Sequence, residues 1–305
     1  MINRMIEKLL KKHYKILGGT KYFIDCSNIT SEPESIIPNK ILKNIDHISI
    51  IKAAINYTKH TKKNKPIVIK ISHKDKTNKK EYQIGENLKS IPGFIKYICL
   101  FNCFDDTYNY IQTNKKIPKK ICTADNISDN DNHVLIMPYI NNSSIRNFKW
   151  SLENTHILKS LLKQCIMSLM YAYLERGFLH NDLHLDNIMF KKTKLDHIRY
   201  RDLEIETKGH KIVIMDFDLS FIGVNREEGI EYYWSNFINL FSRIDFDLNK
   251  FIIPLNAIII TSFINKAKIN YYDPKKTVEL LDLIDKLEFR LPKTLSTPIY
   301  NPYLY

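Results

Sequence analysis

The chain has 305 residues, of which 44% are hydrophobic and 11% aromatic, which excludes a wholly disordered protein and allows a substantial core. Its formal net charge of +13 favours encounters with nucleic acid, nucleotides or acidic proteins, although a lysine-rich surface shaped by coding bias would give the same charge. No arginine-rich patch with interleaved aromatic residues stands out, so the sequence contains no direct nucleic-acid-binding motif.

Residues 1–45 are expected to form an N-terminal extension, a basic helix followed by a loop. The opening stretch MINRMIEKLLKKHYKIL lacks the long apolar run of a signal peptide or a membrane span. The five cysteines have neither metal-site nor disulfide-framework spacing, so we expect free thiols. These features predict an intracellular protein, cytoplasmic or nuclear (virion-associated if viral), without a membrane span. They leave its oligomeric state open.

Residues 46–140 are dominated by runs that are typical of strands. β-Branched residues fill HISIIKAAINY and KPIVIKIS, and further apolar runs are FIKYICLFNCF and HVLIMPYI. Between them, NKKEYQIGENLKSI at 78–91 is typical of a helix, and the polar segment 105–132 is expected to be a loop. The pattern predicts a small, mostly antiparallel β lobe with one helix.

Residues 141–305 are mainly helical in pattern. Apolar residues recur at helical spacing across 154–177, where Gly177 is a plausible helix stop. HKIVIMDFDLSF at 210–221 is expected to be a buried strand ending in two aspartates, and helices follow from about residue 231. With the preceding part, this predicts an α+β protein with two lobes.

The stretch GFLHNDLHLDNIMF at 177–190 crowds polar residues between apolar anchors. One interpretation makes His180 and His184 metal ligands, but zinc proteases need a helix and a Glu after the first His, where Asn181 stands. A second has the polar residues merely satisfying one another. A third is a phosphoryl-transfer loop, in which Asp182 orients a hydroxyl and Asn187 binds magnesium. The strand-terminal Asp216 favours the third.

These motifs resemble the eukaryotic-like protein kinase superfamily. HNDLHLDN is similar to its catalytic loop, DFD stands where the family has Asp-Phe-Gly, and IVIK matches the strand with the phosphate-binding lysine. Within it, the motifs are most similar to haspin-like and virus-encoded serine/threonine kinases. The resemblance implies a bilobal fold, ATP with Mg²⁺ or Mn²⁺, and a protein substrate with a Ser or Thr acceptor.

The resemblance also implies roles for individual residues. Lys70 would contact the α- and β-phosphates, with Glu81 as its ion-pair partner and Glu86 as the alternative. Asp182 would be the catalytic base, and His184 would donate a hydrogen bond to the γ-phosphate. The metal ligands would be Asn187 and Asp216, while His180 would brace the loop.

Further residues would surround the nucleotide. Met137 would be the gatekeeper, the backbone near Tyr139 and Ile140 would meet adenine, and Val68 and Met189 would enclose the base. For these apolar residues, ordinary core packing is an equal alternative. Ala53 and Ala54 are expected to replace the glycine-rich phosphate loop, since small residues let backbone N–H groups approach phosphate.

Departures from the family pattern leave other functions open. Asp218 replaces the glycine of the Asp-Phe-Gly motif, whose Asp binds the metal ion in the family. The short stretch from Asp216 to Ile230 leaves little room for an activation loop. Asn236 is aligned with a loop-anchoring Asp. Alternatives to a protein kinase are a small-molecule phosphotransferase of the aminoglycoside or choline kinase type and a pseudokinase scaffold. The positive charge fits acidic or nucleic-acid-associated targets.

Overall fold

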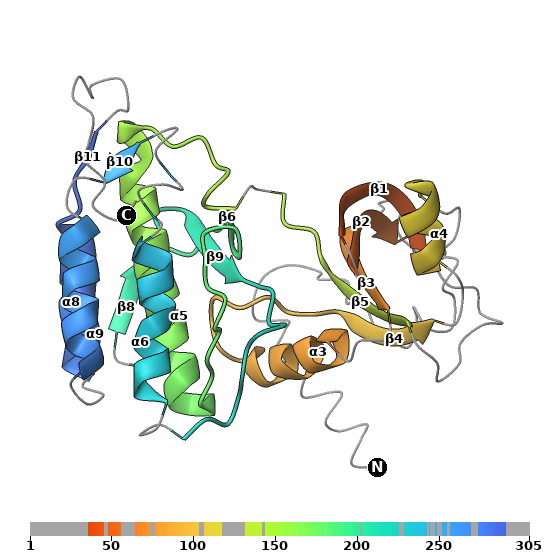
Figure 1. Ribbon diagram of the computed structural model, residues 1–305. Coiled ribbons are helices and arrows are strands. Elements are labelled where there is room, and N and C mark those ends of the chain that lie inside the picture. The colour runs from red at the N-terminus through yellow and green to blue at the C-terminus, as the bar shows by residue number, and fades with distance from the viewer. Residues whose placement is uncertain are drawn as a thin grey trace, which may run out of the picture.

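A sheet-rich part and a helical part lie side by side in the computed structural model (Figure 1). The structure describes residues 36–45, 48–55, 65–73, 77–103, 107–117, 132–141, 144–201, 203–225, 229–242, 252–254, 257–269 and 274–290, and the single positions 244 and 248. The N-terminal helix expected within residues 1–45 lies outside these residues. The α+β fold with two lobes that the sequence predicts is confirmed.

The sheet-rich part is built on five strands in the order β1-β2-β3-β5-β4. These are β1 (Ile36–Ile45), β2 (Ile48–Ile55), β3 (Lys65–His73), β4 (Cys99–Cys103) and β5 (Asn132–Pro138). All neighbouring strands are antiparallel. The sheet includes the ten residues of β1, which the sequence analysis assigned to the extension, so the boundary predicted at residue 46 is too late for the sheet.

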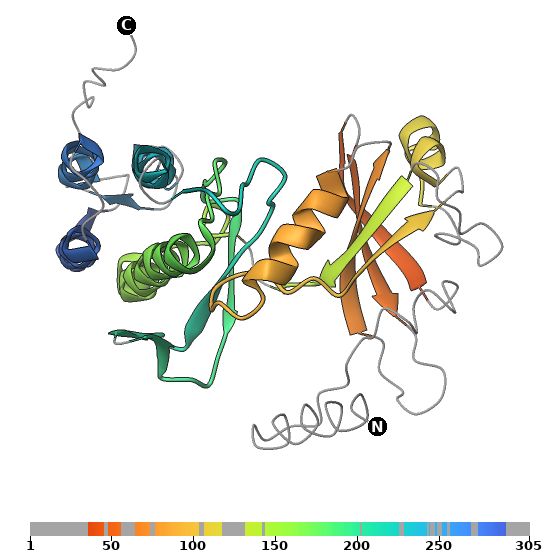
Figure 2. The same ribbon diagram turned by 90° about the horizontal axis from the view of Figure 1, so that it is seen from below.

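One helix covers each face of this sheet (Figure 2). The predicted helix α3 (Thr77–Leu88) packs on β3, β4 and β5. The second helix, α4 (Thr107–Asn114), packs on β2 and β3, within the segment predicted to be a loop. This prediction was wrong because α4 is mostly polar, and the buried residue Ile111 anchors it in the sheet core.

The helical part surrounds the long helix α5 (Thr155–Arg176). The other helices are α6 (Ile230–Ser242), α8 (Ala257–Ile269) and α9 (Pro274–Asp285), after a short 3₁₀ turn at Leu152–Asn154. Helix α5 packs on α9, and α6 packs on α8. These helices confirm the pattern expected after residue 154. Among the described helices, none has the length and hydropathy needed to cross a bilayer.

Short strand pairs complete the helical part. β6 (Ile188–Lys192) pairs with β9 (His210–Ile214), β7 (His197–Tyr200) with β8 (Leu203–Glu206), and β10 (Ile253–Pro254) with β11 (Phe289–Arg290). Only β9 was expected. The β6–β9 ribbon packs on α5 through β9, and one end of the ribbon, where Ile188 pairs with Ile214, carries both polar motifs that the sequence singled out.

The cysteines differ from the expectation of free thiols. Cys165 in α5 is free and fully buried, and its burial raises the pKa of the thiol. Cys99 on β4, in contrast, is disulfide-bonded.

Gly177 allows a test of how closely the end of α5 packs against the backbone of Val224. It ends α5 with a left-handed φ of 59°, and a Cβ at this position would lie 2.4 Å from the carbonyl oxygen of Val224. Gly209 has a similar φ of +73°, but a Cβ there would meet nothing within 4 Å. Left-handed backbone costs an L-residue about 1–2 kcal/mol. We expect Gly209→Ala to lose about this much stability in urea unfolding, and Gly177→Ala to lose clearly more. Equal losses would contradict the close packing at Gly177.

Candidate active site

The β6–β9 ribbon brings two motifs together that lie far apart in the sequence. Its strands pair from Ile188 and Ile214, and just beyond them the Met215 N–H donates to the Asn187 carbonyl at 3.0 Å. Because opposed residues of an antiparallel pair lie only about 4.5–5.5 Å apart, the loop that ends at Asn187 lies beside the turn that begins at Asp216.

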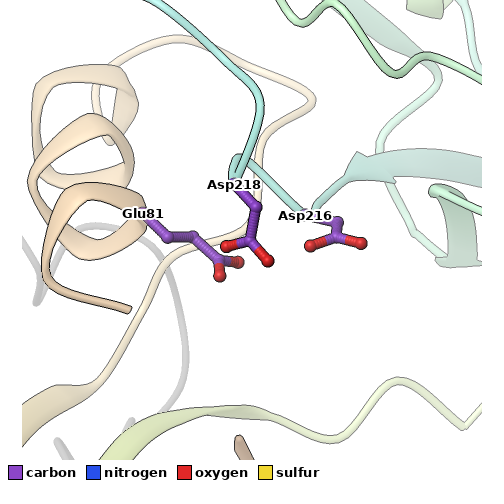
Figure 3. Close-up of side chains that lie close together, drawn as sticks. All are labelled: Glu81, Asp216 and Asp218. Atoms are coloured by element: carbon purple, nitrogen blue, oxygen red, sulfur yellow. The ribbon is translucent and has the colours of Figure 1, made fainter. Parts of the chain in front are cut away.

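The Lys70 ammonium on β3 is surrounded by three carboxylates. Its Nζ lies 2.7 Å from Oε2 of Glu81, 2.8 Å from Oδ2 of Asp218 and 3.1 Å from Oδ1 of Asp216. Figure 3 shows the three acids converging, Glu81 from α3 and the two aspartates from the segment after β9. The Lys70 side chain is 5% exposed, so these carboxylates replace the water that would otherwise solvate its charge.

The charges of this cluster shift the pKa values of its members. Burial alone would lower the pKa of Lys70, but Glu81, Asp216 and Asp218 outweigh it and raise that pKa. Burial raises the pKa of Glu81, which Lys70 opposes and the two aspartates reinforce. Burial would also raise the pKa of Asp216, but Lys70 prevails and lowers it. One cation therefore faces three acids, an excess of negative charge.

Helix α3 distinguishes the two glutamates proposed as partners of Lys70. Glu81 is 1% exposed and faces the sheet, whereas Glu86 forms an exposed ion pair with Lys89 at 2.7 Å on the same helix. Residues five apart lie on different faces of a helix. The lysine on β3 is therefore paired with Glu81.

The loop before β6 presents Asp182 toward solvent. The Asp182 side chain is 46% exposed, and its Oδ2 lies 3.7 Å from Nε2 of His184. Asn187 is 7% exposed, and its side-chain amide donates to the Asp182 carbonyl at 3.0 Å. Asn187 thus fixes the backbone of the loop while the Asp182 carboxylate stays accessible.

Three hydrogen bonds, one buried and two part-buried, hold the backbone around this loop. His180 is fully buried, its Nε2 lies 3.1 Å from the Met215 carbonyl, and burial lowers the pKa of its imidazole. Because a carbonyl can only accept, Nε2 carries the proton. The backbone N–H of Asn181, a residue with a φ of 60°, donates to Oδ1 of Asn236 at 2.9 Å. Ser220 donates to the His180 carbonyl at 3.0 Å.

Comparison with known proteins finds similarity to kinase-like domains. A sequence profile of the ABC1 atypical kinase-like domain matches residues 120–244, which include the loop, the ribbon and the aspartates. The serine/threonine-protein kinase haspin of Mus musculus is 35% identical over 80 residues, and that of Bos taurus is 33% identical over 85. These similarities support a protein-kinase-like domain within this chain. The matches cover 25% and 24% of this kinase-like chain and 11% of each haspin.

Asp218 contributes more to this kinase-like site than its sequence position indicates. It replaces the glycine of a hinge, and its side chain also contacts Lys70 directly, while its Oδ1 is buried without a hydrogen-bond partner. Its ligand oxygens lie within 4.8 Å of those of Glu81 and Asp216. Carboxylate oxygens are ligands that Mg²⁺ and Mn²⁺ prefer. The donor set therefore fits the divalent cation that kinase-like folds use.

Asp186 was missed by the sequence analysis, although it lies within the quoted loop. It accepts from Arg146 at 2.8 Å, from Asn147 at 2.9 Å and from Ser144 at 3.2 Å. These three residues follow the segment that leaves β5. Asp186, the residue before Asn187, therefore bonds the loop to the segment that connects the two lobes. The loop sequence alone does not reveal this long-range contact.

The residues expected around adenine lie where the two parts of the kinase-like chain meet. Val68 on β3 is paired with Met137 on β5, and both pack against the core cluster that contains Ile140. Met189 on β6 packs partly buried against the same cluster. Tyr139 follows β5, and its ring lies 4.0 Å below the Lys52 ammonium. These positions are compatible with both nucleotide contact and core packing.

Ala53 and Ala54 do not form the phosphate loop that the sequence analysis expected. They pair with Ile67 and Pro66 inside β2, whereas the partner of Lys70 is Ile50, near the other end of that strand. Ala53 is 1% exposed and belongs to the core on the far face of the sheet. The two residues that connect β1 and β2 lie outside the described part of the chain. The prediction was wrong because β1 was not recognised as the preceding strand.

Asn236 allows a test of the loop support. Asn236→Ala would leave the Asn181 N–H without its acceptor, and an unpaired buried donor costs about 1–3 kcal/mol. Asn236→Asp keeps an acceptor oxygen at the same place. We expect the alanine variant to lose about 1–3 kcal/mol in urea unfolding and the aspartate variant to stay near the natural protein. Equal stability of all three would remove this support from the loop.

Proposed function

We propose that this chain is an ATP-dependent protein kinase that transfers the γ-phosphoryl group to Ser or Thr hydroxyls of protein substrates. One observation carries the proposal: a buried lysine on the central sheet is paired with a helical glutamate and with the aspartate after β9. Phosphoryl transfer depends on positioning and on charge stabilisation, and such a cluster offers both. In this proposal, the small lobe extends to residue 140 and the large lobe begins at 141.

Asp182 is proposed as the base that orients the acceptor hydroxyl. Its carboxylate is the half-exposed acid of a loop whose backbone is held by Asn187, so an acceptor can reach it. His184, 3.7 Å from that carboxylate, is proposed to donate a hydrogen bond to the γ-phosphate. Correct positioning of donor and acceptor can supply much of the rate.

Lys70 is proposed to contact the α- and β-phosphates of ATP. A lysine ammonium has three N–H donors, and in this structure three carboxylates receive them. Phosphate oxygens would therefore replace at least one aspartate on Nζ. Because Glu81 is nearly fully buried, the aspartates are the partners that can move.

Asn187 and Asp216 are proposed as the ligands of Mg²⁺ or Mn²⁺. When bound, the cation neutralises the charge of the phosphates and of the surrounding acids. The Asp216 side chain is 40% exposed, so it can turn toward a bound nucleotide, and Asn187 lies beside it across the ribbon. Asp218 adds a further oxygen donor within reach of Asp216.

The surface beside Asp182 favours a polypeptide acceptor. Leu219 and Phe221 are 59% and 53% exposed, and both belong to the segment bonded to the loop. The Asn181 side chain donates to the Leu219 carbonyl at 3.2 Å, and Leu179 and Phe221 exchange two backbone hydrogen bonds. Exposed apolar side chains next to a site are typical of protein contacts. The net charge of +13 favours acidic or nucleic-acid-associated substrates, and an intracellular setting fits ATP dependence.

A small-molecule phosphotransferase is the second candidate. Its supporting observation is Asp218, since enzymes of the aminoglycoside and choline kinase type resemble this chain in their loop and often place an acid at that position. A pseudokinase scaffold is less well supported, because a scaffold has no need to bury a charged lysine among three acids.

A transfer assay with labelled ATP distinguishes these candidates. We expect label from γ-³²P-ATP and Mg²⁺ to enter Ser or Thr of a mixed protein panel, and to be lost in Asp216→Ala. Aminoglycosides and choline are offered in parallel. Label in a small molecule alone would favour the second candidate, and ATP binding without transfer would favour the scaffold.

The base is tested by Asp182→Asn. This change keeps the shape of the side chain and removes the proton acceptor, and general-base catalysis contributes about 10²–10⁴ in rate. We expect kcat to fall by about this factor while ATP binding, measured by calorimetry, is retained. Asp196→Asn, on the turn between β6 and β7, is the matched control. Undiminished turnover in Asp182→Asn would exclude this residue as the base.

A further inference from the structure

One aromatic ring, that of Tyr97, packs directly against the backbone of α3. Tyr97 precedes β4 and is 7% exposed. Its ring fills the space beside Gly85, where a Cβ would lie only 2.2 Å from Cδ2 and 2.4 Å from Cε2 of the ring. Gly85 lies one helical turn after Glu81, so both face the ring. The pair of Gly85 and Tyr97 therefore sets how closely α3 approaches the residues beneath it.

The hydroxyl of the same ring donates to Glu81. It contacts Oε1, whereas the other oxygen, Oε2, accepts from Lys70 at 2.7 Å. Each oxygen of this buried carboxylate thus has its own donor, one from the sheet and one from the segment before β4. Burial and the Glu81 charge raise the pKa of Tyr97 well above its ordinary value, so its hydroxyl keeps the proton that it donates.

The Tyr97 ring also contacts the residue between the two aspartates. It packs edge-on against Phe217, which stands between Asp216 and Asp218 in the sequence, and the two ring centroids are 5.9 Å apart. Phe217 is fully buried and packs in turn against Phe94, Phe178 and His180. Through this cluster, the position of Tyr97 is coupled to both aspartates that contact Lys70.

We propose that Tyr97 is a positioning residue, which holds Glu81 on Lys70 and α3 on Phe217 so that the site is assembled before nucleotide binds. The inference rests on the proposed phosphotransfer and adds a residue to which the sequence motifs assign no role. Tyr97 acts through Glu81 and does not contact the phosphates.

The backbone of the segment after Asp218 is held in place on both sides, while the aspartate side chains can still turn. Phe221 exchanges two backbone hydrogen bonds with Leu179, and the Gly223 N–H donates to the Arg176 carbonyl at 2.8 Å. From α3, Lys80 donates to the Asp218 carbonyl at 3.2 Å, and its ammonium lies 4.5 Å from the Phe221 ring. The segment is thus bonded to α3 and to the end of α5, so Tyr97 acts within a fixed frame.

The test compares Tyr97→Phe with Tyr82→Phe. The first change removes only the hydroxyl that contacts Glu81. The second removes the hydroxyl of Tyr82, which follows Glu81 on α3 and whose ring lies 6.4 Å from that of Tyr97. We expect kcat/KM for ATP to fall about tenfold to a hundredfold in Tyr97→Phe, as for loss of a hydrogen bond to a buried charge. In Tyr82→Phe, kcat/KM for ATP should stay within about twofold of the natural protein, a change smaller than the loss of one hydrogen bond would cause.

A double variant separates positioning from general stability. In a Glu81→Gln background, Tyr97→Phe should have little further effect, since residues that act as a unit are not additive. Full additivity of the two losses would overturn the proposal. Activity in Tyr97→Phe equal to that of the natural protein would do the same.

Hydrogen exchange keeps the inference testable if no phosphotransfer is found. We expect the amides of α3 to exchange faster in Tyr97→Phe than in Tyr82→Phe, with α5 unchanged in both. Faster exchange confined to α3 in an inactive protein would support the positioning role and count against the proposed function alone. Unchanged exchange in α3, or equal acceleration in α3 and α5, would overturn the role of Tyr97.

Discussion

The structure depends on a single buried ammonium, that of Lys70. Burying an isolated charge costs on the order of several kcal/mol even after the protein relaxes, so the lysine requires partners. Glu81 comes from α3, and Asp216 and Asp218 come from the turn after β9. The sheet, the helix over it and the ribbon of the other lobe must therefore all be in place before the charge is satisfied. This requirement joins the two parts of the chain at the point where catalysis is proposed.

Two residues of the same site have left-handed backbone. Asp216 and Asn181 have φ values of 68° and 60°, in the left-handed region that L-residues avoid. Such conformations cost about 1–3 kcal/mol each and persist only where the surroundings hold them. Asp216 is held by Lys70, and Asn181 by Asn236. The ion pairs and the loop bonds thus stabilise a geometry that the isolated segments would not adopt.

Much of the fold could be predicted because its signals are local. β2, β3 and α5 have apolar residues at strand or helix spacing, and their partners do not change that pattern. β1 and α4 could not be recognised in this way. β1 contains a proline, asparagines and lysines along an edge of the sheet, and the sequence of α4 is mostly polar. Missing β1 also displaced the expected phosphate loop onto Ala53 and Ala54, since the order of strands decides which turn lies beside Lys70.

The site shows the same division between local and distant signals. Asp182, His184 and Asn187 are close in sequence, so their spacing alone indicated that they act together. The contact between Lys70 and Asp218 joins residues 148 positions apart, and the contact of Tyr97 with Glu81 depends on a glycine one turn further along α3. Neither has a signature in the sequence. Asp218 therefore does more than remove a flexible glycine: it adds a carboxylate to the lysine, and the chain replaces a mobile hinge with an ion pair.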